Sequence, residues 1–320
     1  KKEKSTQPSS WKRKMLIILC SVLAFILVLL IAATAFVEYQ MGRFGDLDNS
    51  TLSPDAIDDI LNGETGTGPH MDDSDVDFGG AVDVLDEEHI INIMLVGQDR
   101  RVGQGRQRSD AMILCSLNTK TKKLTMISFL RDMYVKIPGY RNNKINACYM
   151  IGGADLLNEC LKVNFGVDID YSIEVDFEGF MKLIDIVGGV KIELTADEAA
   201  YLNRRGNWDV TGNDGWTLKK GVNNLNGSQA LAYSRIRAIG MDFERTERQR
   251  KVLNALWSKT KDLDIAKVTQ LINQTVPLIA TDLEMSDMID FATNLLAMGS
   301  ELKIESLRIP ADGTYSFADF

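Results

Sequence analysis

Apolar and polar positions alternate along the chain in a way that predicts a domain of mixed strands and helices. Short continuous apolar runs indicate buried strands, and apolar residues spaced three and four apart indicate helices with one buried face. The strands predicted in this way are 90–96, 111–117, 124–129, 171–175, 190–194 and 302–309. The predicted helices are 154–165, 177–187, 225–237, 265–276 and 285–298. Because the two types alternate, we expect an α/β domain whose mixed central sheet carries helices on both faces.

An uncharged apolar segment precedes this domain. No charged residue occurs from Met15 to Val37, and a helix of this length, about 35 Å, would span a bilayer. The basic residues lie before it, so the positive-inside rule places a tail of residues 1–14 in the cytoplasm and the later chain outside the cell. A cleaved signal peptide is the competing interpretation, but the apolar run is longer than such peptides normally have. We therefore expect a single-pass anchor at 15–37 in the cell membrane.

Charge distinguishes the segment that follows the anchor. Residues 46–88 hold fourteen acidic side chains and no Lys or Arg. This composition is typical of a self-repelling spacer, so residues 38–88 are predicted to be an acidic extracellular linker, with one short helix at 55–61 capped by Ser53. The domain then covers 89–320, where 29 acidic and 29 basic side chains balance. A neutral domain excludes a broad nucleic-acid-binding face.

The arginines of this neutral domain are clustered. Five of them fall within sixteen residues: Arg235, Arg237, Arg245, Arg248 and Arg250. Gly240 is expected to divide the stretch into two helical pieces, and the second piece places Asp242, Arg245 and Gln249 on one face, with Arg248 beside them. Guanidinium groups on a shared face suit phosphate oxygens, because each can donate two parallel hydrogen bonds. A solvated helix with internal ion pairs is the alternative that this stretch alone leaves open.

A second charged group follows the ends of the predicted strands. If the second and third strands form a hairpin, the start of one and the end of the other meet at one edge of the sheet. The residues that would converge there are Asp99, Arg101, Arg106, Arg108, Asp110 and Arg131, with Asp132 following. Two carboxylates, Asp99 and Asp110, suit Mg²⁺, which completes its shell with phosphates and water. No P-loop or kinase signature points to ATP.

Cysteine and histidine add little to this picture. The cysteines of the domain, Cys115, Cys148 and Cys160, lack metal-ligand spacing and are interpreted as small buried hydrophobic residues, although a Cys148–Cys160 bridge remains open. Neither His70 nor His89 lies near the charged clusters, which argues against a zinc site or a histidine base.

The motifs in these clusters resemble, in chain order, those of the LytR–CpsA–Psr family. They are Gly97-Gln98-Asp99, Arg108-Ser109-Asp110-Ala111, Leu130-Arg131-Asp132, Lys144-Ile145-Asn146-Ala147, Gly152-Gly153, Val187-Gly188-Gly189-Val190, Tyr233-Ser234-Arg235-Ile236-Arg237 and Asp242…Arg245…Arg248-Gln249. The resemblance covers about residues 89–260, and the preceding anchor fits it. One departure is Leu130, where the family usually has proline. That proline is conformational rather than chemical, so its absence does not argue against the site.

The resemblance implies a Mg²⁺-dependent phosphotransferase at the outer face of a Gram-positive membrane. Such enzymes move a glycopolymer, such as wall teichoic acid or capsule, from undecaprenyl pyrophosphate to a peptidoglycan hydroxyl and form a phosphodiester. By position, Asp99 and Asp110 correspond to the metal carboxylates. The residues implied in pyrophosphate binding are Arg101, Arg106, Arg108, Lys144, Arg235, Arg237, Arg248 and Gln249. Those implied in catalysis are Arg131, Asp132, Asp242 and Arg245.

Two other functions remain open at this stage. A hydrolase would use the same site with water as the acceptor, and a membrane-anchored regulator would not need Asp99 or Arg131. A lipid substrate would require an apolar tunnel between sheet and helices. Candidates for its lining are Phe177, Phe180, Ile184 and Leu253, although ordinary core packing explains each of them as well. The base is either a carboxylate or a metal-bound group.

Overall fold

A computed structural model describes residues 45, 47–62, 76, 78, 80, 82–84, 88–100, 105–204, 215–240 and 242–316. All of them belong to one unit that spans residues 44–320. The predicted tail at 1–14, the predicted anchor at 15–37 and Arg101 lie outside the described residues. Among the helices that are described, none combines the length and the apolar character that crossing a membrane requires.

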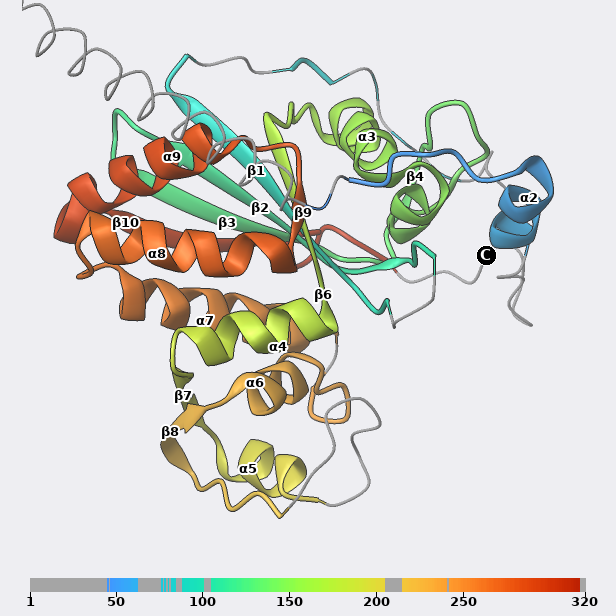
Figure 1. The fold of residues 1–320 in the computed structure, drawn as a ribbon. Coiled ribbons are helices and arrows are strands. Elements are labelled where there is room, and N and C mark those ends of the chain that lie inside the picture. The colour runs from blue at the N-terminus through green and yellow to red at the C-terminus, as the bar shows by residue number, and fades with distance from the viewer. Residues whose placement is uncertain are drawn as a thin grey trace, which may run out of the picture. The chain divides into compact units, whose positions relative to one another are not determined.

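A six-stranded mixed sheet forms the centre of this unit, in the order β10-β3-β2-β1-β6-β9 (Figure 1). Its strands are β1 (Ile90–Gln98), β2 (Ser109–Asn118), β3 (Lys123–Phe129), β6 (Tyr171–Asp176), β9 (Ala280–Thr281) and β10 (Lys303–Ile309). The pairs β1–β2 and β2–β3 are antiparallel, whereas β1–β6 and β3–β10 are parallel. The predicted hairpin of the second and third strands is therefore confirmed, and it brings the start of β2 to the end of β3.

Helices cover both faces of the sheet, as predicted for this α/β fold. On one face, Met94, Met112 and Phe129 pack in a core with α3 (Ile145–Phe165). The neighbouring positions of the same strands point to the other face, because side chains alternate along a strand. That second face is covered by α4 (Phe177–Ile186), α6 (Gly227–Ser234) and α7 (Asp242–Thr260). The helix predicted at 154–165 begins earlier, and the backbone leaves helical geometry at Gly152 and Gly153.

A small lobe continues from α4 and α7 and was only partly predicted (Figure 1). The strand predicted at 190–194 is β7 (Val190–Leu194), and it pairs with β8 (Gly221–Leu225). The helix predicted at 225–237 therefore starts later, at Gly227, where the Asn226 side chain accepts from Gln229 N and caps α6. Helix α5 (Ala196–Leu202) was not expected, although Thr195 and Glu198 form its capping box.

The remaining elements complete the layers or connect them. Helices α8 (Ile265–Thr275) and α9 (Met285–Met298) confirm the two predicted amphipathic helices. The short elements are β4 (Tyr134–Val135), β5 (Asn143–Lys144) and the 3₁₀ turns η2 (Val276–Leu278) and η3 (Gly299–Glu301).

Residues 47–62, which fall in the predicted linker, pack onto the domain. The predicted short helix is present as α2 (Pro54–Asn62), and Ser53 Oγ accepts from Ala56 N at 3.4 Å. Ile57 and Ile60 are buried in the core that includes α3. This stretch is therefore not a free spacer, because its two isoleucines provide an apolar face that the surrounding acidic residues obscure in the sequence.

A glycine allows the segment before α2 to approach α3 closely. Asn49 Oδ1 accepts from Ala154 N at 2.9 Å. A Cβ atom at Gly153, which has φ +67°, would lie only 2.4 Å from the Asp48 carbonyl oxygen. Glycine is needed at this position for its backbone conformation and for space.

Candidate active site

Charged side chains from two strand ends and one helix meet at the end of β3. Arg131 Nη1 donates to Asp110 Oδ1 at 2.6 Å, and Arg131 Nε lies 3.4 Å from Asp132 and 3.7 Å from Asp242. Burial alone would lower the pKa of Arg131, but the three carboxylates outweigh burial and raise it. Arg131 therefore stays protonated at any physiological pH. The convergence expected from the hairpin is present for Asp110 and Arg131.

A β-bulge positions Asp110 in this cluster. Gly97 pairs with Ala111, but Gln98 pairs with Ser109, so Asp110 is the extra residue of β2. Asp99 directly follows Gln98, which places both predicted metal carboxylates at the same end of the β1–β2 pair. Each carboxylate also lies near an arginine from the segment after α6. Asp99 Oδ2 is 3.6 Å from Arg235 Nη2, and Asp110 Oδ1 is 3.7 Å from Arg237 Nη2.

The first turn of α7 contributes a buried arginine. Gly240, with φ +82°, separates α6 from α7, in agreement with the predicted division of the arginine-rich stretch. Arg245 Nη2 donates to Asp242 Oδ2 at 2.8 Å, and Arg245 is only 3% exposed. Its Nε and Nη1 have no hydrogen-bond partner among the described residues. Burial lowers the pKa of this guanidinium. An anion beside Arg245 would supply the missing acceptors.

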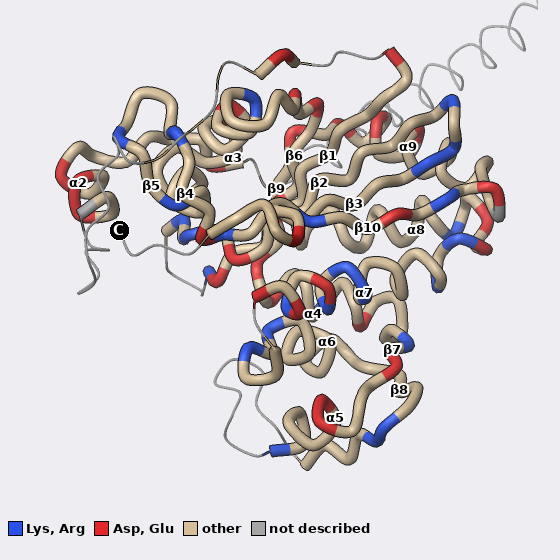
Figure 2. The backbone as a smooth tube through the Cα atoms, turned by 180° about the vertical axis from the view of Figure 1, so that it is seen from behind, with Lys and Arg blue, Asp and Glu red and all other residues tan. Residues whose placement is uncertain are grey.

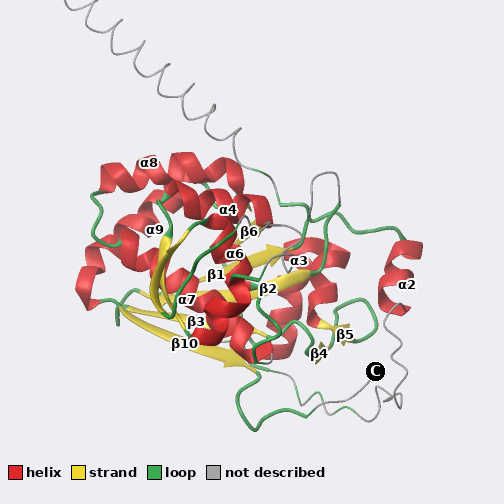
Figure 3. Cartoon of the chain, turned by 90° about the horizontal axis from the view of Figure 1, so that it is seen from below, coloured by secondary structure: helices red, strands yellow, loops and turns green. Residues whose placement is uncertain are grey.

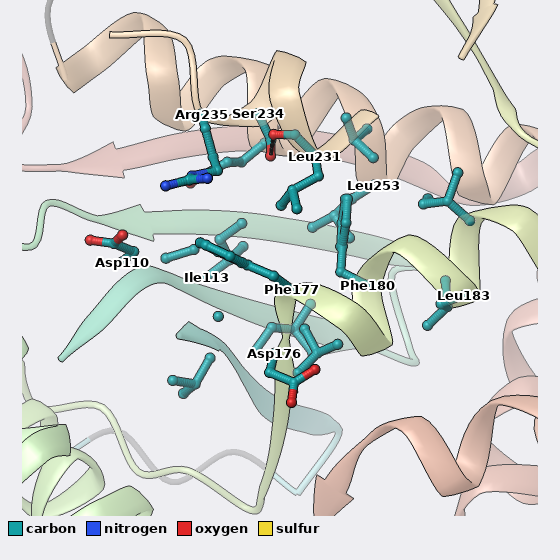
Figure 4. Close-up of a pocket in the computed structure, with 18 of the residues that line it drawn as sticks. Asp110, Ile113, Asp176, Phe177, Phe180, Leu183, Leu231, Ser234, Arg235 and Leu253 are labelled. Carbon is teal, nitrogen blue, oxygen red and sulfur yellow. Dashed lines mark hydrogen bonds between the residues drawn. The ribbon is translucent and has the colours of Figure 1, made fainter. Parts of the chain in front are cut away.

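A cavity of about 330 Å³ adjoins this cluster, between the sheet and the helices on its second face. In Figure 4, Asp110 and Arg235 lie at one end of it and Leu183 lies at the other. The inner lining is almost entirely apolar: Leu95, Ile113, Ile173, Val175, Phe177, Phe180, Leu183, Ile184, Leu231, Val252, Leu253 and Leu256. The four candidate tunnel residues named from the sequence are all among them. The polar lining consists chiefly of Asp110, Asp176, Arg235, Arg237, Arg245 and Gln249.

Phe177 joins the apolar and polar ends of the cavity. Its ring centroid lies 4.4 Å from the guanidinium carbon of Arg235, so the ring and the charged group form a cation–π contact. Asp176, which precedes it, caps α4 by accepting from Gly179 N at 2.8 Å. Strand β6 and helix α4 thereby hold an aromatic ring in contact with an arginine of the cluster.

The structure places Arg106 away from the cluster. It is 6% exposed, and its guanidinium donates to four backbone carbonyls, those of Asp48, Ser50, Met150 and Ile151. This arginine joins the segment before α2 to α3, and its hydrogen-bonding capacity is used there. The sequence does not separate such an arginine from one available to a ligand, because both occur in polar loops.

Arg248 is also placed apart from the cavity. Its Nε donates to Glu198 Oε1 at 2.9 Å, and its two terminal nitrogens donate to the Ile236 and Ile239 carbonyls at 3.1 and 2.8 Å. It therefore ties α5 to the segment between α6 and α7. Arg250 is buried as well and donates to Ser128 Oγ at 2.6 Å. Only Arg245 of the three arginines on α7 lines the cavity.

Arg108 and Lys144 do not line the cavity either. Arg108 donates to Asn146 Oδ1 at 3.2 Å and to the Ile60 carbonyl at 3.1 Å, so it contacts α2 and the start of α3. Lys144 is half-buried at the junction of β5 and α3. Arg101 lies outside the described residues.

Two residues near the site were missed in the sequence. Arg100 Nη2 lies 3.4 Å from Glu174 and 3.6 Å from Asp176. Glu174 is 2% exposed and accepts hydrogen bonds from Gln98 and Tyr149. An acidic residue inside the predicted strand 171–175 was the signal that could have revealed Glu174, because a buried carboxylate needs partners.

The fold and the site together define a class of protein. An apolar cavity that ends at a cluster of arginines suits an amphiphilic ligand with a long apolar tail and an anionic head group. The chain belongs to the LytR_cpsA_psr family, whose sequence model matches residues 63–319.

Individual relatives agree with this assignment. "Regulatory protein MsrR" of Staphylococcus aureus is 31% identical over 70% of this chain, and the match covers 66% of MsrR, slightly less than two thirds. "Polyisoprenyl-teichoic acid--peptidoglycan teichoic acid transferase TagU" of Oceanobacillus iheyensis is 31% identical over 90% of this chain and 83% of its own length.

Solved structures have the same fold. Bacillus subtilis TagV gives a TM-score of 0.60 at 30% identity, covering 72% of this chain and 88% of TagV. Bacillus subtilis TagT, with octaprenyl pyrophosphate bound, gives 0.54 at 28% identity, covering 72% and 83%.

Proposed function

We propose that this protein transfers a glycopolymer from a polyprenyl pyrophosphate carrier to peptidoglycan, forming a phosphodiester. The observation that carries the proposal is the apolar cavity that ends at Arg235, Arg237 and Arg245. The prenyl tail would occupy the cavity, and the pyrophosphate would contact the arginines. The activity for which TagU is named and the prenyl pyrophosphate bound to TagT support this choice. Wall teichoic acid, capsule and related anionic polymers are all compatible with it.

The residues of the chain account for binding and for charge stabilisation. Arg235, Arg237 and Arg245 would bind the phosphate oxygens, and Arg131 would stabilise the charge on the transferred phosphoryl group. The acceptor hydroxyl attacks the phosphorus that bears the polymer. A new oxygen–phosphorus bond forms while the bond to the bridging oxygen breaks, and polyprenyl phosphate leaves. Asp132, whose side chain is 51% exposed, would take the hydroxyl proton, since Asp242 is hydrogen-bonded to Arg245.

We propose Mg²⁺ as the metal of this reaction, held by Asp99 and Asp110. Their carboxylates are the hard oxygen donors that Mg²⁺ prefers, and they occupy one end of the β1–β2 pair. In the part of the chain that the structure describes, no group of three or more His, Cys, Asp or Glu side chains gathers for a metal. Substrate phosphates and water would therefore complete the shell. When bound, the ion would neutralise charge that develops on the phosphate oxygens.

The metal assignment makes a direct prediction for Asp110→Asn. The variant should keep the fold but lose at least a hundredfold in Mg²⁺-dependent turnover, because the amide is a weaker donor to a hard cation. Steady-state kinetics against Mg²⁺ concentration, together with the melting temperature, would check this. Unchanged turnover at all Mg²⁺ concentrations would remove Asp110 from the metal site.

The proposed location follows from the sequence. The segment 15–37 would anchor the protein in the cell membrane, with residues 1–14 in the cytoplasm and the domain outside. This position would bring the domain to the membrane surface, where the lipid carrier lies.

Mass spectrometry of the full chain, purified in detergent, tests the substrate class. We expect a co-purified polyprenyl phosphate or pyrophosphate in the wild type and at least tenfold less in Arg235→Ala/Arg237→Ala. Arg141→Ala, at an exposed position away from the cavity, is the matched control and should keep the lipid. A wild type without lipid would count against the proposal. Product analysis then separates transfer, which gives polymer-modified peptidoglycan, from hydrolysis, which gives free polymer phosphate.

The name of MsrR favours a second candidate, a regulator without chemistry. Such a protein would retain its effect in cells when Asp99→Asn and Arg131→Ala remove the charged cluster. If these variants lose both the effect in cells and the turnover measured with purified protein, the regulator without chemistry is excluded.

A further inference from the structure

A second group of side chains lies beside the arginine cluster and does not line the cavity. Phe243 and Tyr315 have ring centroids 5.2 Å apart. The guanidinium carbon of Arg308 lies 3.8 Å from the Phe243 centroid, and Arg308 pairs with Asp312. These four residues, Phe243, Arg308, Asp312 and Tyr315, are called the ring cluster below. They come from the start of α7, from β10 and from the segment after it.

Strand pairing places the ring cluster next to the reacting groups. Strands β3 and β10 run parallel and side by side (Figure 3), and Leu130 N donates to the Ile309 carbonyl at 3.0 Å. The segment after β10 therefore begins beside the one that carries Arg131. Arg131 in turn lies 3.7 Å from Asp242, which directly precedes Phe243. The charged cluster thus has the apolar cavity on one side and the ring cluster on another.

Charge around this region is mixed rather than uniformly basic. Figure 2 shows acidic and basic residues close together along α4 and α7. Within the ring cluster itself, the Arg308 side chain is 17% exposed and the Asp312 side chain is 86% exposed. A nearly buried donor beside an exposed acceptor suits a ligand that offers both hydroxyl and acyl groups, since a purely anionic ligand would be repelled by the carboxylate.

We propose that the ring cluster binds a sugar ring of one of the two glycan substrates, beside the arginines that bind the pyrophosphate. This inference rests on the proposed function. The carbon–hydrogen face of a pyranose removes apolar area from water when it packs on a half-exposed aromatic ring such as Tyr315. Arg308 and Asp312 donate to and accept from its polar groups. The sugar is either the first residue of the donor polymer or the acceptor residue of peptidoglycan, because both must lie next to the reacting phosphate.

The experiment measures binding of three probes to the full chain by calorimetry. The probes are a prenyl pyrophosphate without sugar, the same lipid carrying a disaccharide, and a soluble N-acetylglucosamine–N-acetylmuramic acid oligosaccharide. Tyr315→Ala should weaken one sugar-bearing probe at least tenfold, about 1.4 kcal/mol, and should leave the sugar-free lipid unchanged. Weakening of the lipid disaccharide identifies the donor sugar, and weakening of the oligosaccharide identifies the acceptor. Tyr315→Phe keeps the ring and should keep the binding.

Tyr201→Ala is the matched control. Tyr201 also lies beside an arginine, with the Arg204 guanidinium carbon 5.9 Å from its ring centroid, but it belongs to α5 in the small lobe. The Tyr201→Ala variant should bind all three probes with the same affinity as the wild type. Arg308→Gln provides a second variant in case Tyr315→Ala lowers the melting temperature, and it should weaken the same probe.

Two results would overturn the inference. One is wild-type affinity of Tyr315→Ala and Arg308→Gln for both sugar-bearing probes, which would leave the ring cluster with the structural role of fastening residues 310–316 to α7. The other is a wild-type protein that binds the lipid disaccharide no more tightly than the sugar-free lipid and gives no signal with the oligosaccharide above the buffer control. Failure of the proposed function has a different signature, since there the wild type would not bind the sugar-free prenyl pyrophosphate.

Discussion

At the scale of single residues, Arg245 shows how a site can be prepared for an anion at a cost to stability. Its charge is buried, one carboxylate pairs with it, and two of its nitrogens lack acceptors among the described residues. Buried donors without partners are costly, so the ligand-free protein holds this guanidinium in an unfavourable environment. A phosphate group would relieve that cost, and part of the binding energy would come from this relief.

The consequence can be measured with Arg245→Met. We expect the melting temperature of the ligand-free protein to stay the same or to rise, because an unsatisfied buried charge is replaced by an apolar chain of similar length. The stabilisation that inorganic pyrophosphate gives the wild type should be lost, since a ligand whose Kd rises above its concentration no longer stabilises the folded protein. Scanning calorimetry with and without pyrophosphate tests both parts. A fall in the ligand-free melting temperature with an intact pyrophosphate effect would make Arg245 structural.

For Arg106 we expect the opposite effects on stability and on ligand binding from those expected for Arg245. Its guanidinium satisfies four backbone carbonyls, so Arg106→Met should cost about 3 kcal/mol of the free energy of unfolding. Affinity for prenyl pyrophosphate in the folded fraction should not change. Urea denaturation and lipid binding give the two readouts, with Arg235→Ala as the variant of reverse behaviour. A large loss of lipid affinity at unchanged stability would return Arg106 to the site.

At this scale, the site residues that could be predicted from the sequence are those whose place is decided by their position along a strand. Asp99, Asp110 and Arg131 were placed together because they flank predicted strands, and the pairing of β1, β2 and β3 then fixes where they meet. The places of Arg106 and Arg248 could not be predicted, because nothing in a single sequence shows which carbonyls a buried guanidinium will contact. The bulge at Asp110 could not be predicted either, since it depends on the register between β1 and β2.

At the scale of elements, α2 and the preceding segment extend the domain into the predicted linker. Arg108 contacts the Ile60 carbonyl, and Asn143 Nδ2 donates to the Leu61 carbonyl at 3.3 Å, so the end of α2 is held by two polar side chains. The acidic composition of residues 46–88 indicated a spacer because the many carboxylates outweigh the few apolar residues of α2. The amphipathic spacing of a single short helix was the more specific signal.

Removing the apolar face of α2 should therefore destabilise the domain. We expect Ile57→Ala/Ile60→Ala to lower the free energy of unfolding by about 4 kcal/mol, because each change leaves a cavity in the core. Val163→Ala, at a side chain that is 45% exposed, should change it by less than about 0.5 kcal/mol. Chemical denaturation of the three proteins checks this. Equal stability of the double variant and the wild type would mean that α2 is a spacer after all.

At the scale of the whole molecule, the layered α/β arrangement was predictable because strands and helices differ in period and length. The small lobe was predicted less well. Strand β8 has few apolar residues, and it forms because β7 offers it a partner far along the chain. The cavity also depends on contacts between distant parts of the chain, because its lining comes from β1, β2, β6, α4, α6 and α7. In a sequence, apolar residues that line a cavity cannot be distinguished from apolar residues that fill a core.

The cavity gives the prediction that depends on the whole arrangement. Leu253→Trp adds a large side chain to the lining, so the space available to a prenyl tail should shrink. We expect affinity for prenyl pyrophosphate to fall at least tenfold, about 1.4 kcal/mol, while affinity for inorganic pyrophosphate stays the same. The added ring enters open space, so the cost in stability should be small compared with overpacking a closed core.

Val222→Trp is the control for this change, because Val222 is 70% exposed on β8 and lies outside the cavity lining. Titration calorimetry of both variants with the two ligands separates tail binding from head-group binding. If Leu253→Trp binds the prenyl ligand as tightly as the wild type does, the tail must lie elsewhere, and the arginines alone would account for recognition. If both ligands bind more weakly, the substitution has disturbed the charged cluster, and a smaller change at the same position, Leu253→Phe, would decide between the two explanations.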